Sequence, residues 1–182
     1  MSALAGRRVA LIATDGFENA ELFEPRQVLL DAGALVEVIS IKNGQAQGYR
    51  EFERADAITV DKRAISAEAN DYDALLLPGG TINGDKLRGD ADVLRLVRGF
   101  FDADKPVAAL CHAPWVLIDA GVTAGRRMTS YHTIRRDVEN AGAEWVDGPA
   151  VVDRNLLTSR DPNDIPAFNA AMLRLFESGL NT

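Results

Sequence analysis

The segment PVAALCHAPWVLIDAG, residues 106–121, changes from an apolar run to helix-forming residues at Cys111. Its first part is short and apolar throughout, which is typical of a buried strand in a parallel sheet. Its second part, residues 113–121, ends in glycine, as helices commonly do. Cys111 is therefore predicted at a bend between strand and helix, the arrangement of a nucleophile elbow. The helix N-terminus would stabilise a thiolate there and lower the pKa of the thiol.

Other segments on both sides of this one show alternating strand and helix patterns. Apolar runs predict three more strands at residues 8–14, 35–41 and 74–78. Helical patterns follow at residues 19–33, 90–104, 133–142 and 161–179, and Asp90 is an expected N-cap. Residues 143–159 predict strands joined by tight turns around Gly148–Pro149 and Arg154–Asn155. The alternation predicts an α/β fold, with a doubly wound, mostly parallel sheet sandwiched by helices, in a single domain over residues 1–182.

Composition limits the possible partners and the compartment. The chain has 20 basic and 27 acidic side chains and a formal net charge of −7, which argues against specific nucleic acid and an anionic membrane surface as partners. Its single cysteine cannot form an intramolecular disulfide, so an oxidising compartment is not implied. No apolar segment approaches the roughly 20 residues that span a bilayer. We therefore expect a cytoplasmic protein.

Two more segments are expected at the sheet edge where Cys111 lies, since ligands bind at the carboxyl ends of parallel strands. Gly79 and Gly80 follow a predicted strand, and glycines there let backbone N–H groups approach an oxyanion. Glu18 and Glu21 follow the first strand and, three residues apart, would share a helix face. Each feature also has a purely structural interpretation: a buried cysteine, an ordinary turn and two solvated carboxylates.

Five motifs occur in an order that makes the resemblance to a known family specific. The chain resembles the PfpI superfamily, the class I glutamine amidotransferase-like group that includes intracellular cysteine proteases, bacterial general stress proteins and the parkinsonism-associated deglycase. The resemblance implies a flavodoxin-like fold. The motifs span nearly the whole chain and read DGFENAEL, LLLPGG, LCHAPWVLIDAG, TSYHTIRRDVENAGAEWVD and LLTSRDPNDIPAF.

The resemblance also implies a role for each matched residue. Cys111 would be the nucleophile and His112 its base, oriented by Asp85 of a neighbouring subunit. Glu21 would hydrogen-bond the sulfur as a carboxylic acid. The N–H groups of Gly80 and His112 would form the oxyanion hole. Glu18 and Tyr131 would line the pocket.

Some positions depart from the family pattern. Gly84 stands where proline is usual, and Asp85 is one methylene shorter than the usual Glu, which puts the reach of the acid in question. Trp115 stands where relatives often have a polar residue. His132 replaces a proline common in the subgroup, and its interpretation stays open between the pocket rim and the surface.

The resemblance implies an enzyme that acts on reactive aldehydes or their glycation adducts, as a deglycase or glyoxalase-like hydrolase active in stress. Peptide hydrolysis is the alternative chemistry, and a redox sensor or chaperone-like stress protein is the alternative class. A glutamine amidotransferase would need a later His-x-Glu pair, which neither His112 nor His132 provides. The expected partners are a small aldehyde or glycated substrate and further copies of the chain in a homodimer or higher homo-oligomer. No cofactor and no metal are expected, because the soft ligands are too few for a zinc site.

Overall fold

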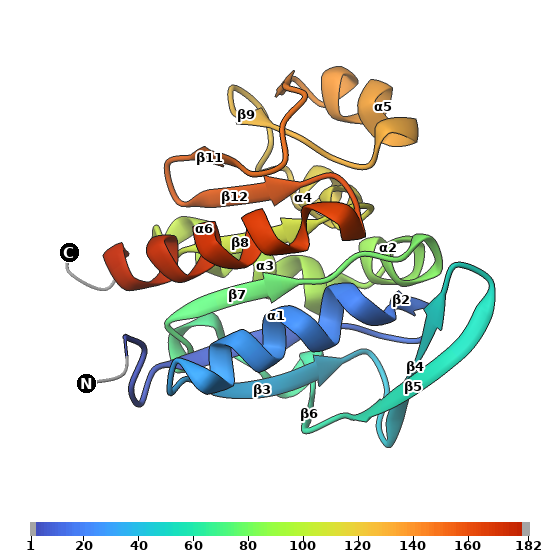
Figure 1. Cartoon of the computed structure of the whole chain (residues 1–182), viewed down its shortest axis with the longest axis vertical. Helices are drawn as coiled ribbons and strands as arrows, with labels where there is room; N and C mark the ends of the chain where they lie inside the picture. Colours follow the sequence, from blue (N-terminus) through green and yellow to red (C-terminus); the bar gives the residue numbers. More distant parts are fainter. Residues whose placement is uncertain (1–2, 180–182) are drawn as a thin grey trace.

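The computed structural model describes residues 3–179 and is organised around a seven-stranded sheet (Figure 1). Six of the strands run parallel, and β11 pairs antiparallel with β12 at one edge. The strand order is β11 (Val151–Asp153), β12 (Leu156–Ser159), β8 (Val107–Leu110), β7 (Ala74–Leu77), β1 (Arg8–Ile12), β3 (Leu35–Ser40) and β6 (Lys62–Arg63). After β1, the chain adds β3 and then β6 on one side of β1. It then returns and adds β7 on the other side of β1, so the direction in which strands are added to the sheet reverses between β1 and β7.

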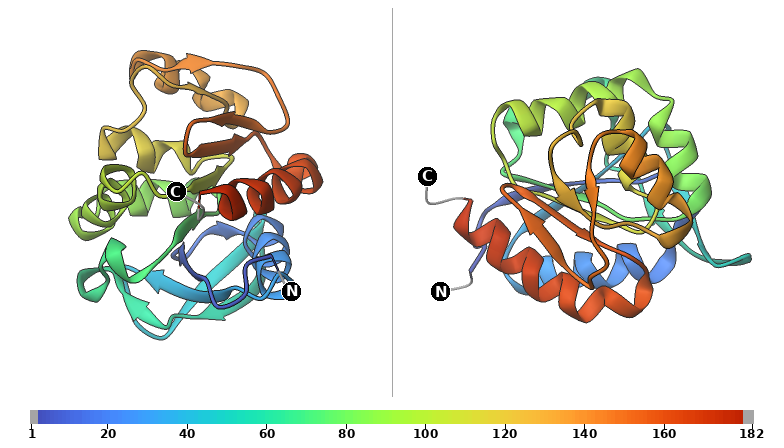
Figure 2. Two further views of the ribbon diagram at one scale, coloured as in Figure 1. Left: turned by 90° about the vertical axis from the view of Figure 1, so that its left-hand side faces the viewer. Right: turned by 90° about the horizontal axis from the view of Figure 1, so that it is seen from above.

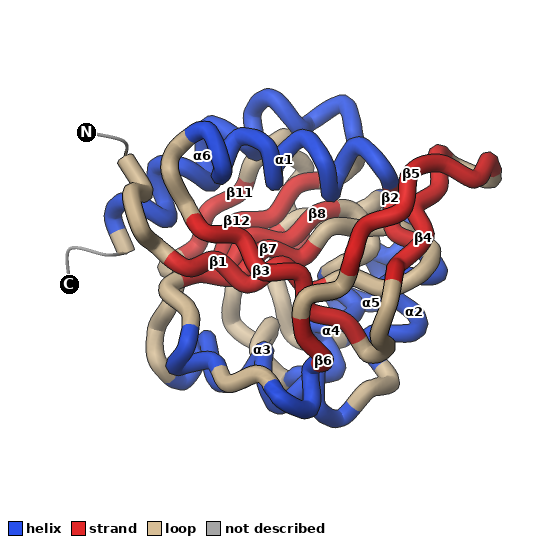
Figure 3. The backbone as a smooth tube through the Cα atoms, turned by 90° about the horizontal axis from the view of Figure 1, so that it is seen from below, coloured by secondary structure: helices blue, strands red, loops and turns tan. Residues whose placement is uncertain are grey.

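Helices cover both faces of this sheet, and the predicted doubly wound α/β fold is confirmed (Figures 2 and 3). One face carries α1 (Asn19–Asp31) and α6 (Ile165–Ser178), which pack against each other. The other face carries α2 (Thr81–Arg88), α3 (Ala91–Asp102) and α4 (Pro114–Ala120). Side chains alternate along β1 between two apolar clusters: Ala10 and Ile12 face the second helical layer, and Val9 and Leu11 the first.

Two small elements lie outside the main sheet. A three-stranded sheet is formed by β2 (Phe17–Glu18), β4 (Gln45–Arg50) and β5 (Glu53–Thr59), and its hairpin projects away from the helical layers (Figure 3). The second element pairs β9 (Arg127–Met128) with β10 (Glu144–Trp145) beside α5 (Arg135–Asn140). No helix within residues 3–179 is long and apolar enough to cross a membrane.

Most of the elements expected from the sequence are present, with three differences. The cap at Asp90 is confirmed, since its side chain accepts from the N–H groups of Asp92 and Val93. The turn at Arg154 is also present, but Gly148–Pro149 does not join paired strands, because β10 and β11 belong to different sheets. Helix α2 and the β4–β5 hairpin were not expected from the pattern of apolar residues.

The buried face of α3 provides a test of the packing. Phe100 is fully buried in the core, whereas Phe52 at the tip of the hairpin is 95% exposed. We expect Phe100→Ala to lower the free energy of unfolding by about 3–5 kcal/mol, since it removes buried contacts and leaves a cavity. Phe52→Ala is the matched control and should change it by less than about 0.5 kcal/mol. Urea unfolding of the two variants measures both values, and equal losses would contradict this packing.

Candidate active site

The bend at Cys111 is held in a left-handed backbone conformation. Its φ is 60°, between the end of β8 and the start of α4. The N–H of Cys111 donates to the carbonyl of Ser159 at 3.0 Å, and its own carbonyl accepts from the N–H of Tyr131 at 2.8 Å. Neighbours on both sides thus fix the backbone, and the predicted strand–turn–helix elbow is present.

The glycine pair brings β7 against this bend. A Cβ on Gly79 would collide with the Glu21 carboxylate and lie 2.6 Å from the Cβ of Cys111. Gly80 is the N-cap residue before α2, and its φ of 102° is a backbone conformation that residues with a side chain rarely adopt. The backbone N–H groups of Gly80 and His112 both donate to the sulfur of Cys111. Two backbone donors therefore meet at Sγ, where they favour the thiolate over the thiol.

Glu21 places a carboxyl group beside the thiol inside the protein. The side chain is fully buried in the first turn of α1, and neither oxygen has a partner of good hydrogen-bond geometry. Burial raises the pKa of Glu21 from its usual 4.5 to about 8, and the nearby Glu18 adds to the increase, while contacts with Cys111 and the N–H of Gly79 oppose it. Glu21 is therefore mainly a neutral acid at neutral pH.

The sequence-based expectation of a lowered pKa for the Cys111 thiol is wrong for this buried position. Cys111 is only 6% exposed, and burial raises the pKa of the thiol well above its usual value. Glu21 raises it further, while the N–H groups of Gly80 and His112 act in the opposite direction. The helix N-terminus does not outweigh these effects. Cys111 and Glu21 therefore retain their protons together, because two negative charges side by side in an apolar pocket are unfavourable.

His112 contacts the sulfur and lies among aromatic rings. Its Nδ1 is 3.2 Å from Sγ of Cys111, and its Nε2 is 3.4 Å from Oγ1 of Thr81. The imidazole stacks on Tyr131 with the ring centres 4.7 Å apart and meets Trp115 edge-on at 5.1 Å. Burial lowers the pKa of His112, and His132 lowers it further, so the ring is neutral and able to accept a proton.

Not every predicted residue joins this cluster. Glu18 lies in β2, before α1 begins, so it shares no helix face with Glu21; it accepts from the N–H of Glu51 at 3.2 Å. Asp85 is exposed on α2, and within residues 3–179 no carboxylate bonds to the ring of His112. Trp115 is half-buried and donates its indole N–H to Asp137 at 2.8 Å. His132 is exposed beside Tyr131, with the ring centres 4.5 Å apart.

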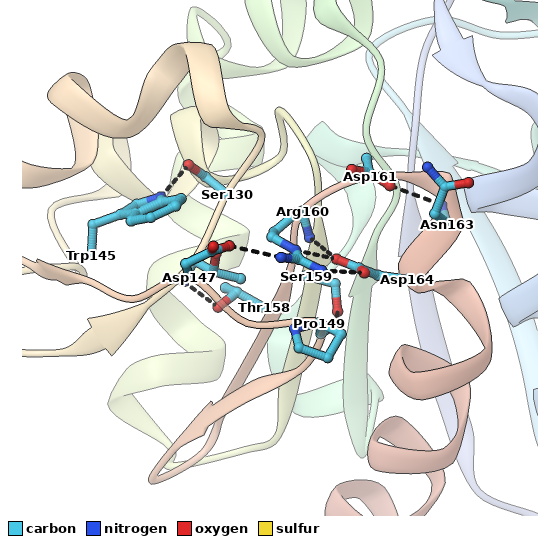
Figure 4. Close-up of polar contacts among 11 residues, drawn as sticks. Ser130, Trp145, Asp147, Pro149, Thr158, Ser159, Arg160, Asp161, Asn163 and Asp164 are labelled. Carbon is cyan, nitrogen blue, oxygen red and sulfur yellow. Dashed lines mark hydrogen bonds and ion pairs between the residues drawn. The ribbon is translucent and has the colours of Figure 1, made fainter.

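The corner between β12 and α6 was missed as part of the site (Figure 4). It follows Ser159, whose carbonyl holds Cys111, and it includes Arg160 and Asp161. The N–H and the guanidinium of Arg160 bond to Asp164 at 2.9–3.0 Å. Only the quoted motif around TSRDPND could have indicated it, since hydrogen bonds between distant segments leave no periodic pattern. In residues 3–179, no group of three His, Cys, Asp or Glu side chains is placed to hold a metal ion.

Comparison with known proteins confirms the resemblance. The DJ-1/PfpI family profile matches residues 7–175. Protein/nucleic acid deglycase 2 of Escherichia coli is 41% identical over 170 residues, which cover 93% of this chain and 97% of that protein. General stress protein 18 of Bacillus subtilis is 41% identical over 177 residues, covering 94% of this chain and 99% of that protein. Schizosaccharomyces pombe DJ-1 has a TM-score of 0.82 over 96% of this chain and 97% of its own, and its 20% identity supports the fold alone.

The buried acid predicts how stability depends on pH. Between its unfolded value of 4.5 and its folded value of about 8, Glu21 keeps in the folded protein a proton that the unfolded chain releases. Stability should therefore fall as pH rises through this window, by at most about 1.4 kcal/mol per pH unit. Glu21→Gln should remove this slope, while Glu24→Gln, at an exposed position of α1, should keep it. Denaturant unfolding at pH 5, 6, 7 and 8 measures the slopes, and a Glu21→Gln slope equal to that of the wild type would contradict a buried neutral acid.

Proposed function

This chain belongs to the DJ-1/PfpI family, and on that basis we propose that it is a cysteine-dependent enzyme acting on reactive aldehydes or their glycation adducts. The observation that supports this most directly is the set of groups around one sulfur: the Glu21 acid, the His112 ring and the N–H groups of Gly80 and His112. An acid, a base and two oxyanion donors around a thiol suit addition to a carbonyl-derived carbon. The name of the Escherichia coli relative describes the same chemistry for that protein.

The proposed reaction removes the aldehyde from an amine. The sulfur of Cys111 bonds to the adduct carbon that carries the amine, and the amine leaves with the thiol proton by way of His112, so a hemithioacetal remains. His112, as the base, then moves a proton from that carbon to the adjacent carbonyl carbon. Glu21, as the neutral acid, protonates the carbonyl oxygen and takes back the proton of the hydroxyl group on the attacked carbon, which gives a thioester of a 2-hydroxy acid. Water hydrolyses the thioester and restores the thiol. A free α-oxoaldehyde enters the same path when the thiol adds to it directly.

The alternatives fit the pocket less well. A peptide is a weaker electrophile than an α-oxoaldehyde and needs an extended cleft beside the nucleophile, whereas Cys111 is 6% exposed. A redox sensor needs an accessible thiolate, because the thiolate is the form that oxidises. Burial instead raises the pKa of Cys111. We also propose a cytoplasmic location, since the reaction requires Cys111 as a reduced thiol.

We further propose a homodimer in which Asp85 of one subunit orients His112 of the other. Nε2 of His112 lies beside the exposed residue Thr81, and Asp85 is exposed one helical turn further along α2. A two-fold dimer that brings two α2 helices together would complete both sites symmetrically.

Removing the nucleophile tests the reaction. We expect Cys111→Ser to abolish turnover of methylglyoxal and of its adduct with an arginine derivative, because the thioester path requires sulfur. The measurement is the release of 2-hydroxy acid and of free amine. Ser130→Ala, which changes a buried hydroxyl outside the sulfur's contacts, is the control and should keep most of the activity. Wild-type turnover in Cys111→Ser would refute the proposal.

Mixing subunits tests the shared site. We expect Asp85→Ala to slow turnover by about ten- to a thousandfold, the range for a base that loses its orienting group, while Cys111 stays alkylatable. Inactive Cys111→Ser and Asp85→Ala subunits, mixed and exchanged, should regain activity, because one site of each mixed dimer has both groups. Mass spectrometry verifies the exchange. Absence of recovery after exchange would show that Asp85 does not act across subunits.

A further inference from the structure

A cavity of about 540 Å³ lies between the β4–β5 hairpin, the turn at Asp15 and helix α2, which contributes Lys86 to its wall. Its volume is within the range of small-molecule sites. We propose that this cavity binds a phosphate ester that carries a planar ring, such as a nucleoside monophosphate. The inference does not depend on the proposed reaction, because no residue that lines the cavity is among the groups that contact the sulfur of Cys111.

One wall of the cavity follows from the alternation of side chains along β4. Gln45, Gln47 and Tyr49 are two residues apart, so they share one face of the strand. All three line the cavity. Arg54 is the partner of Tyr49 across the hairpin, and side chains of directly opposed residues lie next to each other. An aromatic ring and a guanidinium are therefore neighbours on this wall.

Gln47 holds the guanidinium of Arg54 in place. Its side-chain oxygen accepts from Nε of Arg54 at 2.7 Å, while its side-chain nitrogen donates to the carbonyls of Gly48 at 2.9 Å and Ala55 at 2.7 Å. Within residues 3–179, no hydrogen bond or ion pair engages the two terminal nitrogens of Arg54. A guanidinium anchored at one edge, with its other N–H groups open to a ligand, suits the oxygens of a phosphate.

The charges on the cavity wall leave a positive excess. Lys42 bonds to both carboxylate oxygens of Asp15, at 2.9 and 3.1 Å, and the N–H of Gln47 donates to the same carboxylate at 2.9 Å. This pair is neutral as a unit. Arg54 and Lys86 remain as two cations that form no ion pair with the described part of the chain. The formal net charge of the whole chain is −7, so a cationic cavity contrasts with the rest of the molecule and attracts anions.

A phosphate ester with a ring matches both features of the wall. A phosphate monoester carries nearly two negative charges at neutral pH and has three acceptor oxygens, which a guanidinium and an ammonium can bind together. The half-buried ring of Tyr49 offers a flat surface on which a second ring can stack. The cavity is far larger than a phosphate ion alone requires, so it has room for the organic part of the ester.

The cavity uses a different side of α2 from the one proposed to meet a second subunit. Asp85 lies one turn after Thr81, whereas Lys86 lies one turn after Ile82. A Cβ added to Gly16 would collide with Ile82, so the side with Ile82 and Lys86 faces the turn between β1 and β2. The hairpin and α2 lie at the same end of the molecule (Figures 1 and 3). Ligand binding and association through Asp85 therefore do not compete for the same helix face.

Calorimetric titration of the wild type with adenosine monophosphate tests the site without any turnover. We expect a Kd of about 1 mM or tighter at low salt, and weaker binding at high salt because the charges are screened. Adenosine lacks the phosphate and should bind about tenfold or more less tightly. Glycerol 3-phosphate lacks the ring and should bind about fivefold or more less tightly.

Substitutions assign these effects to the cavity. Arg54→Gln should weaken binding of adenosine monophosphate by about ten- to a hundredfold, the range for lost hydrogen bonds to a charged group. Lys86→Gln, at an exposed position, should weaken it by about two- to fivefold. Tyr49→Leu should reduce the preference for adenosine monophosphate over glycerol 3-phosphate. Arg50→Gln is the matched control: it removes the same charge on the opposite face of β4 and should leave the affinity unchanged.

Several results would overturn the proposal. Absence of saturable binding at about 10 mM adenosine monophosphate would do so, as would equal affinity for adenosine, or an Arg54→Gln affinity equal to that of the wild type. Alkylation of Cys111 with iodoacetamide, verified by mass spectrometry, blocks the thiol and should leave the affinity for adenosine monophosphate unchanged. Loss of binding on alkylation would place the ligand at the thiol and would refute a separate site.

Discussion

The left-handed backbone of Cys111 is the constraint on which the site depends. Among residues 3–179, four residues other than glycine have positive φ, and Cys111 is the one that is buried. An L-residue in this conformation costs about 1–2 kcal/mol. The hydrogen bonds from Cys111 to Ser159 and from Tyr131 to Cys111 hold the residue on both sides. Because two neighbouring segments fix the bend, the sulfur lies at the end of the apolar cluster on the α1–α6 side of the sheet, beside Gly80 and Glu21.

The same bend explains why a carboxyl group is buried without a well-formed hydrogen bond. Gly79 has no side chain, and a Cβ there would collide with the Glu21 carboxyl group that lies beside Cys111. A buried polar group without a partner is costly, and a buried charge costs far more. Glu21 reduces this cost by keeping its proton, and Cys111 does the same. The two apolar clusters on either side of the sheet must offset what remains, so the fold supports a site that is unfavourable in itself.

The sequence predicted the elements whose signals are local. Strands β7 and β8 are continuous apolar runs, β1 and β3 are mostly apolar, and α3 has both an apolar face and a capping residue at Asp90. Helix α2 was missed because TINGDKLR contains Asn and Gly in its centre, which weaken helix propensity. Tertiary contacts stabilise it instead: the buried side chain of Asn83 accepts from the N–H of Thr14 and donates to the carbonyls of Pro78 and Gly79. The polar β4–β5 hairpin is held in the same way, through Asp15 and Gln47.

The sequence predicted that Cys111 and His112 lie together at a bend after a strand. It did not predict their ionisation, because that depends on burial and on groups that the fold brings from α1 and β7. For Nδ1 of His112 to accept the thiol proton, Nε2 must carry a proton and donate to a neighbour such as Thr81. The imidazolium formed by that transfer needs a nearby anion. Within the described chain, burial and the neighbouring His132 both lower the pKa of His112 and so disfavour a positive charge on its ring. The folded chain thus provides the sulfur, a neighbouring carboxylic acid and two N–H donors, while it opposes a charged His112. In the proposed mechanism, a group at the exposed side of α2 would have to supply the missing negative charge, and this is the position proposed for Asp85 of a second subunit.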